Sequence, residues 1–143
     1  MYQHITIVGR LGRDPEMRYT PSGQAVTSFN VATDRQYTDA NGQKVKETTW
    51  FRVSVWGKQA ETTNQYLKKG LLVLVDGRLT PDPKTGGPRV WKRQDGTEGA
   101  SFEISASSVR FLSPRSESGG SGGGEYGEEG SMAPAGGDED IPF

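Results

Sequence analysis

The sequence has no cysteine and a single histidine, His4. Without cysteine the chain forms no disulfide, zinc ribbon or thiolate nucleophile. A catalytic triad or a multi-histidine metal site would have to be built around His4 alone. The sequence also lacks the Gly-x-x-x-x-Gly-Lys-Ser/Thr loop that cradles nucleotide phosphates. We therefore expect a protein that is not an enzyme and that carries no metal or other cofactor.

Long apolar runs are also missing. No stretch of about 18 apolar residues occurs, so we expect no membrane span. Residues 1–6 lack the basic start and apolar run of a signal peptide. We see no internal repeat, and 143 residues suffice for one domain with a modest core. These absences predict a soluble, cytoplasmic protein with a single folded domain.

The net charge of −1 conceals an uneven distribution of charge along the chain. Residues 1–112 carry 16 Lys and Arg against 11 Asp and Glu. Residues 113–143 carry one arginine against seven acidic residues. A basic body followed by an acidic tail is typical of proteins that bind nucleic acid with one part and a partner with the other.

The composition changes abruptly after Leu112. Residues 113–137 are rich in Gly, Ser and Glu, and such a segment buries too little apolar surface to offset its chain entropy. We predict a disordered linker there. The last six residues break this pattern, because three acids are followed by an apolar ending. We interpret them as a tip that docks in a basic pocket with an apolar floor on a partner protein. The tip consists of Asp138, Glu139, Asp140, Ile141, Pro142 and Phe143.

The body, residues 1–112, reads as strands with one helix. Alternating polar and apolar residues predict strands at 5–11, 25–35, 46–56, 71–79 and 102–112. Helical spacing predicts a helix over 58–69, which Gly70 would end. Residues 80–101 are rich in Pro and Gly and predict a protruding, mobile hairpin. Three strands, a helix and two more strands match the five-stranded OB barrel, an all-β fold.

The third predicted strand carries the most informative pattern. Alternation puts Phe51 on one face with two valines, and puts Trp50, Arg52 and Trp56 on the other. Core faces rarely include an unpaired arginine, so we assign the Phe51 face to the core and leave the two tryptophans exposed. Exposed flat rings suit the stacking of unpaired bases. The alternative is that a tryptophan packs under the long hairpin or in a subunit interface.

Further aromatic residues are interleaved with cations on the predicted loops. Tyr37 lies near Arg35, and Trp91 lies inside the run Arg-Val-Trp-Lys-Arg. Such a pattern on an OB-like barrel predicts a track for single-stranded nucleic acid, without the base-edge contacts of a sequence-specific reader. The predicted stacking residues are Tyr37, Trp50, Trp56 and Trp91. The predicted phosphate-binding residues are Arg10, Arg35, Lys44, Lys46, Arg52, Lys58, Arg89, Lys92 and Arg93.

The same residues carry a family resemblance. The segment IVGRLGRDPEMRYTPSG at residues 7–23 resembles the first strand and turn of bacterial single-stranded DNA-binding proteins. Later blocks resemble that family in the family's own order, at residues 50–53, 56–58, 66–70 and 75–79. The ending DEDIPF is similar to the family's partner-binding motif. The resemblance covers residues 1–112 and the last six residues.

The resemblance implies a homotetramer of OB domains with DNA wrapped around it, associated with the nucleoid. It implies action in replication, recombination and repair, with the tip binding enzymes of those processes. Trp50, Trp56 and Trp91 fall at the family's base-stacking positions, and Tyr37 falls where the family often has tryptophan. The domains implied are an OB domain at 1–112, a linker at 113–137 and a docking tip at 138–143.

Two departures from the family pattern bear on these expectations. Residues 80–90 are longer than the family's usual connection, which affects where Trp91 lies. Phe51 stands where several members carry histidine near a subunit contact, so details of assembly are expected to differ. Two other functions stay open at this point. One is a different OB-type module, such as an RNA chaperone or a translation factor. The other is a nuclease, although it would need clustered carboxylates that we do not find.

Overall fold

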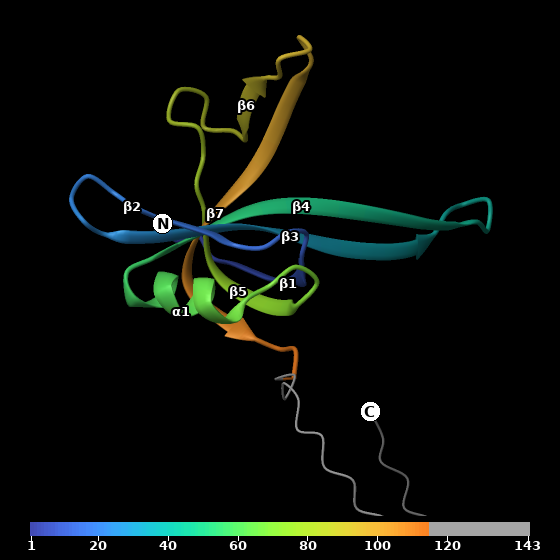
Figure 1. Cartoon of the computed structure of the whole chain (residues 1–143). Coiled ribbons are helices and arrows are strands. Elements are labelled where there is room, and N and C mark those ends of the chain that lie inside the picture. The colour runs from blue at the N-terminus through green and yellow to red at the C-terminus, as the bar shows by residue number, and fades with distance from the viewer. Residues whose placement is uncertain (115–143) are drawn as a thin grey trace, which may run out of the picture.

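The computed structural model describes residues 1–114, which form seven strands and one helix (Figure 1). Apart from its first two residues, the predicted linker lies outside the described residues, and so does the whole predicted tip. The elements are β1 (Ile5–Leu11), β2 (Glu16–Tyr19), β3 (Ala25–Thr38), β4 (Lys44–Trp56), α1 (Lys58–Tyr66), β5 (Leu72–Leu79), β6 (Arg89–Lys92) and β7 (Glu98–Phe111).

Five of these strands close into a barrel. They pair in the order β1-β5-β7-β4-β3, and β3 returns to β1 through the pairs Arg10 with Ala32 and Leu11 with Val31. The β4–β7 contact is parallel, whereas the other barrel contacts are antiparallel. The helix lies between the third and fourth barrel strands along the chain. The prediction of a five-stranded OB barrel with one helix is therefore confirmed.

The barrel core consists of inward-facing side chains from every barrel strand, as alternation requires. Phe29, Val31, Val53 and Val55 are almost completely buried on β3 and β4. The helix covers one end of the barrel, where the Thr27 hydroxyl donates a 2.6 Å hydrogen bond to the Ala60 carbonyl. The remaining core residues are Ile7, Leu11, Leu67, Val73, Val75, Ile104 and Val109.

The helix ends three residues before the predicted end at Lys69. Leu67 is extended and buried, and the chain turns back toward β1 after it. The Lys69 amide donates to a carboxylate oxygen of Asp14 at 2.8 Å, and the Gly70 amide donates to the Leu11 carbonyl at 2.8 Å. These contacts hold residues 67–70 against the loop after β1, so the last predicted helical turn does not form. Among the described residues, no helix is long and apolar enough to cross a membrane.

Two short strands were not predicted. β2 pairs with the start of β3, and β6 pairs with the start of β7. Each has four residues with little burial, so neither carries the alternation that identifies a strand. Residues 80–101 are therefore only partly a loop, and their second half is a two-stranded hairpin. The predicted protrusion is confirmed, since β6 and the start of β7 project away from the barrel (Figure 1).

A second hairpin extends well beyond the barrel. β3 and β4 pair without interruption from Val26 with Trp56 to Thr38 with Lys44. We call residues 33–49 the β3–β4 arm, because β1 pairs with β3 only up to Ala32 and β7 pairs with β4 only from Phe51 (Figure 1). The arm ends in a tight turn, where Gly42 has a φ of 78° and the Asp39 carboxylate accepts two backbone hydrogen bonds.

Candidate nucleic-acid interface

Trp50 and Trp56 lie on the solvent side of β4. Their exposed fractions are 52% and 43%, whereas the neighbouring Val53 and Val55 are fully buried. Arg52, between the two tryptophans, is also exposed. The assignment of the two faces of β4 from the position of Arg52 is therefore confirmed. We call the surface that carries Trp50, Arg52 and Trp56 the tryptophan face.

Small and polar residues on β3 leave this face open. Ala32 lies opposite Trp50 and Asn30 lies opposite Arg52 in the antiparallel ladder. Side chains directly opposite each other are near neighbours, so large residues at these positions on β3 would cover the rings. Within residues 1–114, no carboxylate lies within ion-pairing distance of the Arg52 guanidinium. The face thus presents two aromatic surfaces with a free cation between them.

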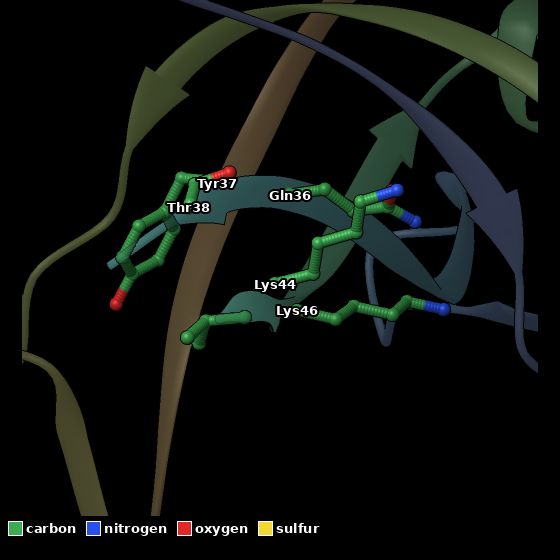
Figure 2. Close-up of a pocket in the computed structure, with 6 residues that line it drawn as sticks. Gln36, Tyr37, Thr38, Lys44 and Lys46 are labelled. Atoms are coloured by element: carbon green, nitrogen blue, oxygen red, sulfur yellow. The ribbon is translucent and has the colours of Figure 1, made fainter. Parts of the chain in front are cut away.

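The same face continues along the β3–β4 arm. Strand alternation places Lys46 and Lys44 on the side of β4 that carries Trp50. From Trp56 to Lys44 this row spans about 40 Å at the usual rise per residue of a strand. The two lysines line a shallow pocket of about 310 Å³ at the end of the arm, and the other lining residues are Gln36, Tyr37, Thr38 and Val45. Figure 2 shows both ammonium groups pointing the same way.

Tyr37 lies on the opposite side of the arm. Its ring points away from the Lys44 and Lys46 ammonium groups in Figure 2. The Arg35 guanidinium lies 4.9 Å from the centre of the ring, and the Tyr37 hydroxyl donates to Glu47 at 3.1 Å. The Glu47 carboxylate, which accepts this hydrogen bond, raises the pKa of Tyr37 above its usual value. The structure therefore does not bring Tyr37 together with Trp50 and Trp56 on one face.

Each face of the arm also holds an ion pair. On the side of Tyr37, Arg35 lies 3.7 Å from Glu47. On the lysine side, Lys46 lies 3.3 Å from Asp34, which also accepts a 2.7 Å hydrogen bond from Thr48. The Thr48 hydroxyl and then the Lys46 ammonium lower the pKa of the Asp34 carboxyl. Two of the predicted phosphate-binding cations therefore already have an acidic partner.

Trp91 lies on the second projecting hairpin. It is 43% exposed on β6, where all four residues face solvent. Its cross-strand neighbour on β7 is Gly99. Arg89 lies 3.9 Å from Glu103, and the Arg93 guanidinium donates to the Thr97 hydroxyl at 3.3 Å and the Glu98 carbonyl at 3.1 Å. Trp91 is thus exposed as predicted, on a different hairpin from the tryptophan face.

The other predicted cations differ in how they are held. The Arg10 guanidinium donates to the Gly70 carbonyl at 3.0 Å. Arg10 pairs with Ala32 across β1 and β3, and Ala32 pairs with Trp50 across β3 and β4. Arg10 therefore lies in line with the tryptophan face. Lys58 begins α1, directly after Trp56 and Gly57. In the described part of the chain, Lys44, Lys58 and Lys92 have no carboxylate within ion-pairing distance.

Several exposed aromatic residues were not identified from the sequence, and Phe102 is one of them. Phe102, on β7, keeps 46% of its surface exposed and contacts Phe51 with 5.9 Å between ring centres. It lines a second pocket of about 220 Å³ with residues of the 79–88 loop. Alternation along β7 does not predict this exposure, because it places Phe102 on the same side of the strand as the buried Ile104. Among residues 1–114, no group of three or more acidic or histidine side chains could hold a metal ion.

Most of the chain is similar to known proteins. Residues 2–112 match the Single-strand binding protein family. A single-stranded DNA-binding protein of Neisseria meningitidis serogroup A is 43% identical over 126 residues, covering 88% of this chain and 67% of that protein. Single-stranded DNA-binding protein A of Bacillus subtilis is 41% identical over 128 residues, covering 90% of this chain and 69% of that protein.

A solved structure gives the same result for the fold. A deletion mutant of the single-stranded DNA binding protein from Thermus aquaticus superposes with a TM-score of 0.62 at 31% identity. The match covers 80% of this chain, which spans only 52% of the Thermus aquaticus chain. The barrel, the exposed aromatic residues and the match over residues 2–112 agree with one another. The chain belongs to the single-strand binding protein family.

Proposed function

We propose that this protein binds single-stranded DNA without sequence specificity and performs no catalysis. The observation that carries the proposal is the tryptophan face, where two half-exposed rings flank an unpaired arginine. Bases of any sequence stack on such rings, because every base has a flat π-surface, and the cation meets the phosphates between them. The base-stacking residues proposed are Trp50, Trp56, Trp91 and Tyr37.

The arrangement of these side chains supports one path for the bound DNA along the protein. The tryptophan face and the lysine side of the β3–β4 arm form one row, so we place the main track along the outer side of β4. Tyr37 and Trp91 lie off this row and would receive other segments of a longer strand. The proposed phosphate-binding residues on the row are Lys44, Lys46 and Arg52, with Arg10 and Lys58 beside it. Arg35 and three residues of the β6–β7 hairpin, Arg89, Lys92 and Arg93, would serve the outlying segments.

Binding to poly(dT) is expected to weaken as salt concentration rises. Each neutralised phosphate releases counterions, which gives a log–log slope of about −0.7 per phosphate for single strands. Lys44→Gln removes a cation that has no carboxylate within ion-pairing distance in the described chain. It should therefore reduce the magnitude of the slope by about 0.7. The measurement is fluorescence anisotropy of labelled oligonucleotides over a series of salt concentrations.

Lys68→Gln is the matched control for this experiment. Lys68 is also an exposed lysine, but it follows α1 and is not part of the row on β4. Its replacement should leave the slope unchanged. Equal slopes for the Lys44 variant and the parent protein would contradict the proposed track. The same titrations with poly(rU) compare DNA with RNA, and a preference for poly(rU) would favour an RNA-binding module instead.

We also propose that three segments of the chain have different functions. Residues 1–112 bind DNA, residues 113–137 act as a tether, and residues 138–143 recruit replication, recombination and repair proteins. The charge sequence supports this division, because the basic body is followed by a segment with seven acids and one arginine. A tethered acidic tip stays at high local concentration near the DNA-bound body.

Deletion of residues 138–143 is expected to abolish capture of such partner proteins from a lysate. The affinity for poly(dT) should stay the same or rise slightly, because the acidic tip competes with DNA for the basic body. Pull-down and anisotropy titration on the same preparation measure the two effects. If the shortened protein still captures the same partners, the tip is not the docking segment. A variant that reverses the order of residues 119–124 keeps the charge and the length, and serves as control.

Family membership supports a homotetramer, which we propose as the assembly that binds DNA. Phe51 lies between the core and Phe102, so its ring contributes to the end of the barrel as well as to the interior. Light scattering of the full chain, with and without oligo(dT), measures the assembly. A monomer at every concentration tested would contradict this part of the proposal.

A further inference from the structure

Four glycines in the described chain leave no room for a Cβ atom, and they fall into two groups. At Gly9 and Gly77 an added Cβ would overlap the carbonyl oxygens of Ala32 and Ser105, respectively. At Gly12 and Gly99 it would instead meet the rings of tryptophans. The first group serves the packing of backbone on backbone. The second group is different, because the groups that need the space are two of the proposed stacking residues.

The Trp50 ring extends across β3 and lies over Gly12. An ideal Cβ at Gly12 would be 2.5 Å from Trp50 Cζ3 and 2.7 Å from Cη2, well inside van der Waals contact. Ala32, the cross-strand neighbour of Trp50, is small enough for the ring to pass over it. Gly12 is itself fixed to β3, because its amide donates to the Asn30 carbonyl at 3.1 Å. One part of the indole therefore rests on a fixed backbone, while half of the side chain remains exposed.

The Trp91 ring is supported in the same way on the other hairpin. An ideal Cβ at Gly99 would lie 2.8 Å from Trp91 Cε2, 2.9 Å from Cζ2 and 3.0 Å from Nε1. The two residues are directly paired across β6 and β7. Neither Gly12 nor Gly99 has a positive φ, so the backbone conformation does not require glycine at either place. What requires glycine there is the ring.

We propose that Gly12 and Gly99 are positioning residues that hold Trp50 and Trp91 flat for base stacking. This inference rests on the proposed function. A free tryptophan on a strand loses side-chain freedom when a base stacks on it, and a ring already resting on backbone loses less. Trp56 provides an internal contrast, because no glycine of the described chain beyond its own neighbour Gly57 has the Trp56 ring among the atoms nearest an added Cβ. The two glycines thus orient the rings before DNA arrives.

Gly12→Ala and Gly99→Ala test the inference, with Gly87→Ala as the matched control. At Gly87 an added Cβ would meet only the Thr85 hydroxyl oxygen, at an ordinary 3.7 Å. The NMR signal of each indole N–H reports the position of its own ring. We expect Gly12→Ala to shift the Trp50 signal and Gly99→Ala the Trp91 signal, with the Trp56 signal unchanged. Gly87→Ala should move none of the three.

Affinity for poly(dT) should fall about fivefold or more in Gly12→Ala, and by less than in Trp50→Ala. In the Trp50→Ala background, Gly12→Ala should cause no further loss, because the ring it displaces is gone. If Trp50→Ala weakens binding but Gly12→Ala leaves both affinity and the Trp50 signal unchanged, the positioning role is wrong. If Trp50→Ala itself has no effect, the proposed stacking function is wrong instead.

A loss of folding in Gly12→Ala would also be informative. The added methyl group meets the far end of a side chain, which can move, so we expect thermal stability close to that of the parent protein. If Gly12→Ala is nevertheless unstable, the double variant with Trp50→Ala separates two causes. Recovery of stability in the double variant shows that the ring occupies the space over Gly12. Continued instability shows that the glycine serves the backbone and overturns the inference.

Discussion

Replacing both Trp50 and Trp56 with alanine is expected to weaken binding to poly(dT) by roughly 30-fold or more. Loss of one stacked base contact costs about 1–3 kcal/mol, and two such losses combine to at least about 2 kcal/mol. The fold should persist, because both side chains lie on the solvent side of β4 and the core beneath it is formed by Val53 and Val55. Anisotropy titration with labelled poly(dT) gives the affinity, and circular dichroism verifies the fold.

Tyr2→Ala is the matched control for the tryptophan variants. Tyr2 is another exposed aromatic, but it lies near the N-terminus, where its ring stacks on His4. Its loss should leave the affinity unchanged. Each single tryptophan variant should show part of the loss seen in the double variant. If the double variant binds as well as the parent protein but assembles differently by light scattering, the rings belong to a subunit contact and not to a DNA track.

Gly9→Ala is expected to destabilise the barrel by about 3 kcal/mol or more. Overpacking costs about 1–3 kcal/mol where side chains can adjust, and more where they cannot. At Gly9 an added Cβ would overlap the Ala32 carbonyl oxygen and lie 2.6 Å from Val31 Cγ1. Ala32 and Val31 are the β3 residues that pair with β1, so the methyl group would push apart the strands that close the barrel. Thermal unfolding followed by far-UV circular dichroism measures the effect.

For a domain of this size, such a loss lowers Tm by about 12 °C or more. Gly87→Ala is the control here as well, because its added Cβ has space. A Tm for Gly9→Ala within about 2 °C of the parent value would show that the barrel still closes when β1 and β3 are pushed apart. The Tm of Gly12→Ala gives a second comparison. The two variants should differ sharply in Tm although the glycines are three residues apart, because an added Cβ meets backbone at Gly9 and a movable ring at Gly12.

Much of the barrel could be predicted from the sequence, because the signals are local. Arg52 alone indicated which face of β4 is exposed to solvent. Alternation then assigns every neighbouring residue to the exposed or the buried face. The five barrel strands and the helix carry their own patterns of apolar residues. β2 and β6 do not, because four mostly exposed residues have no buried face to mark them. They form because β3 and β7 offer a free edge beside them.

The parts of the site that could not be predicted depend on register between distant segments. The contact of Trp50 with Gly12 joins β4 to the loop after β1, and no spacing in the sequence reveals it. Tyr37 lies on the side of the arm opposite Lys44 and Lys46, and this position follows from the unbroken pairing of β3 with β4 as far as Thr38. Likewise, counting cations overstates the free positive charge. Arg35, Lys46 and Arg89 each lie near a carboxylate that only the folded hairpins bring close.

The distribution of the three tryptophans also determines what the protein's own fluorescence reports. All three lie on the surface of the described chain, whereas the largest buried side chain is Phe29. Indole emission responds to the polarity and stacking around the ring, so it should change strongly when a ligand covers these surfaces. Opening of the barrel uncovers only the part of each ring that rests on the protein, so it should change the emission less than a bound ligand does. Intrinsic fluorescence of this protein is therefore a better measure of surface occupancy than of folding.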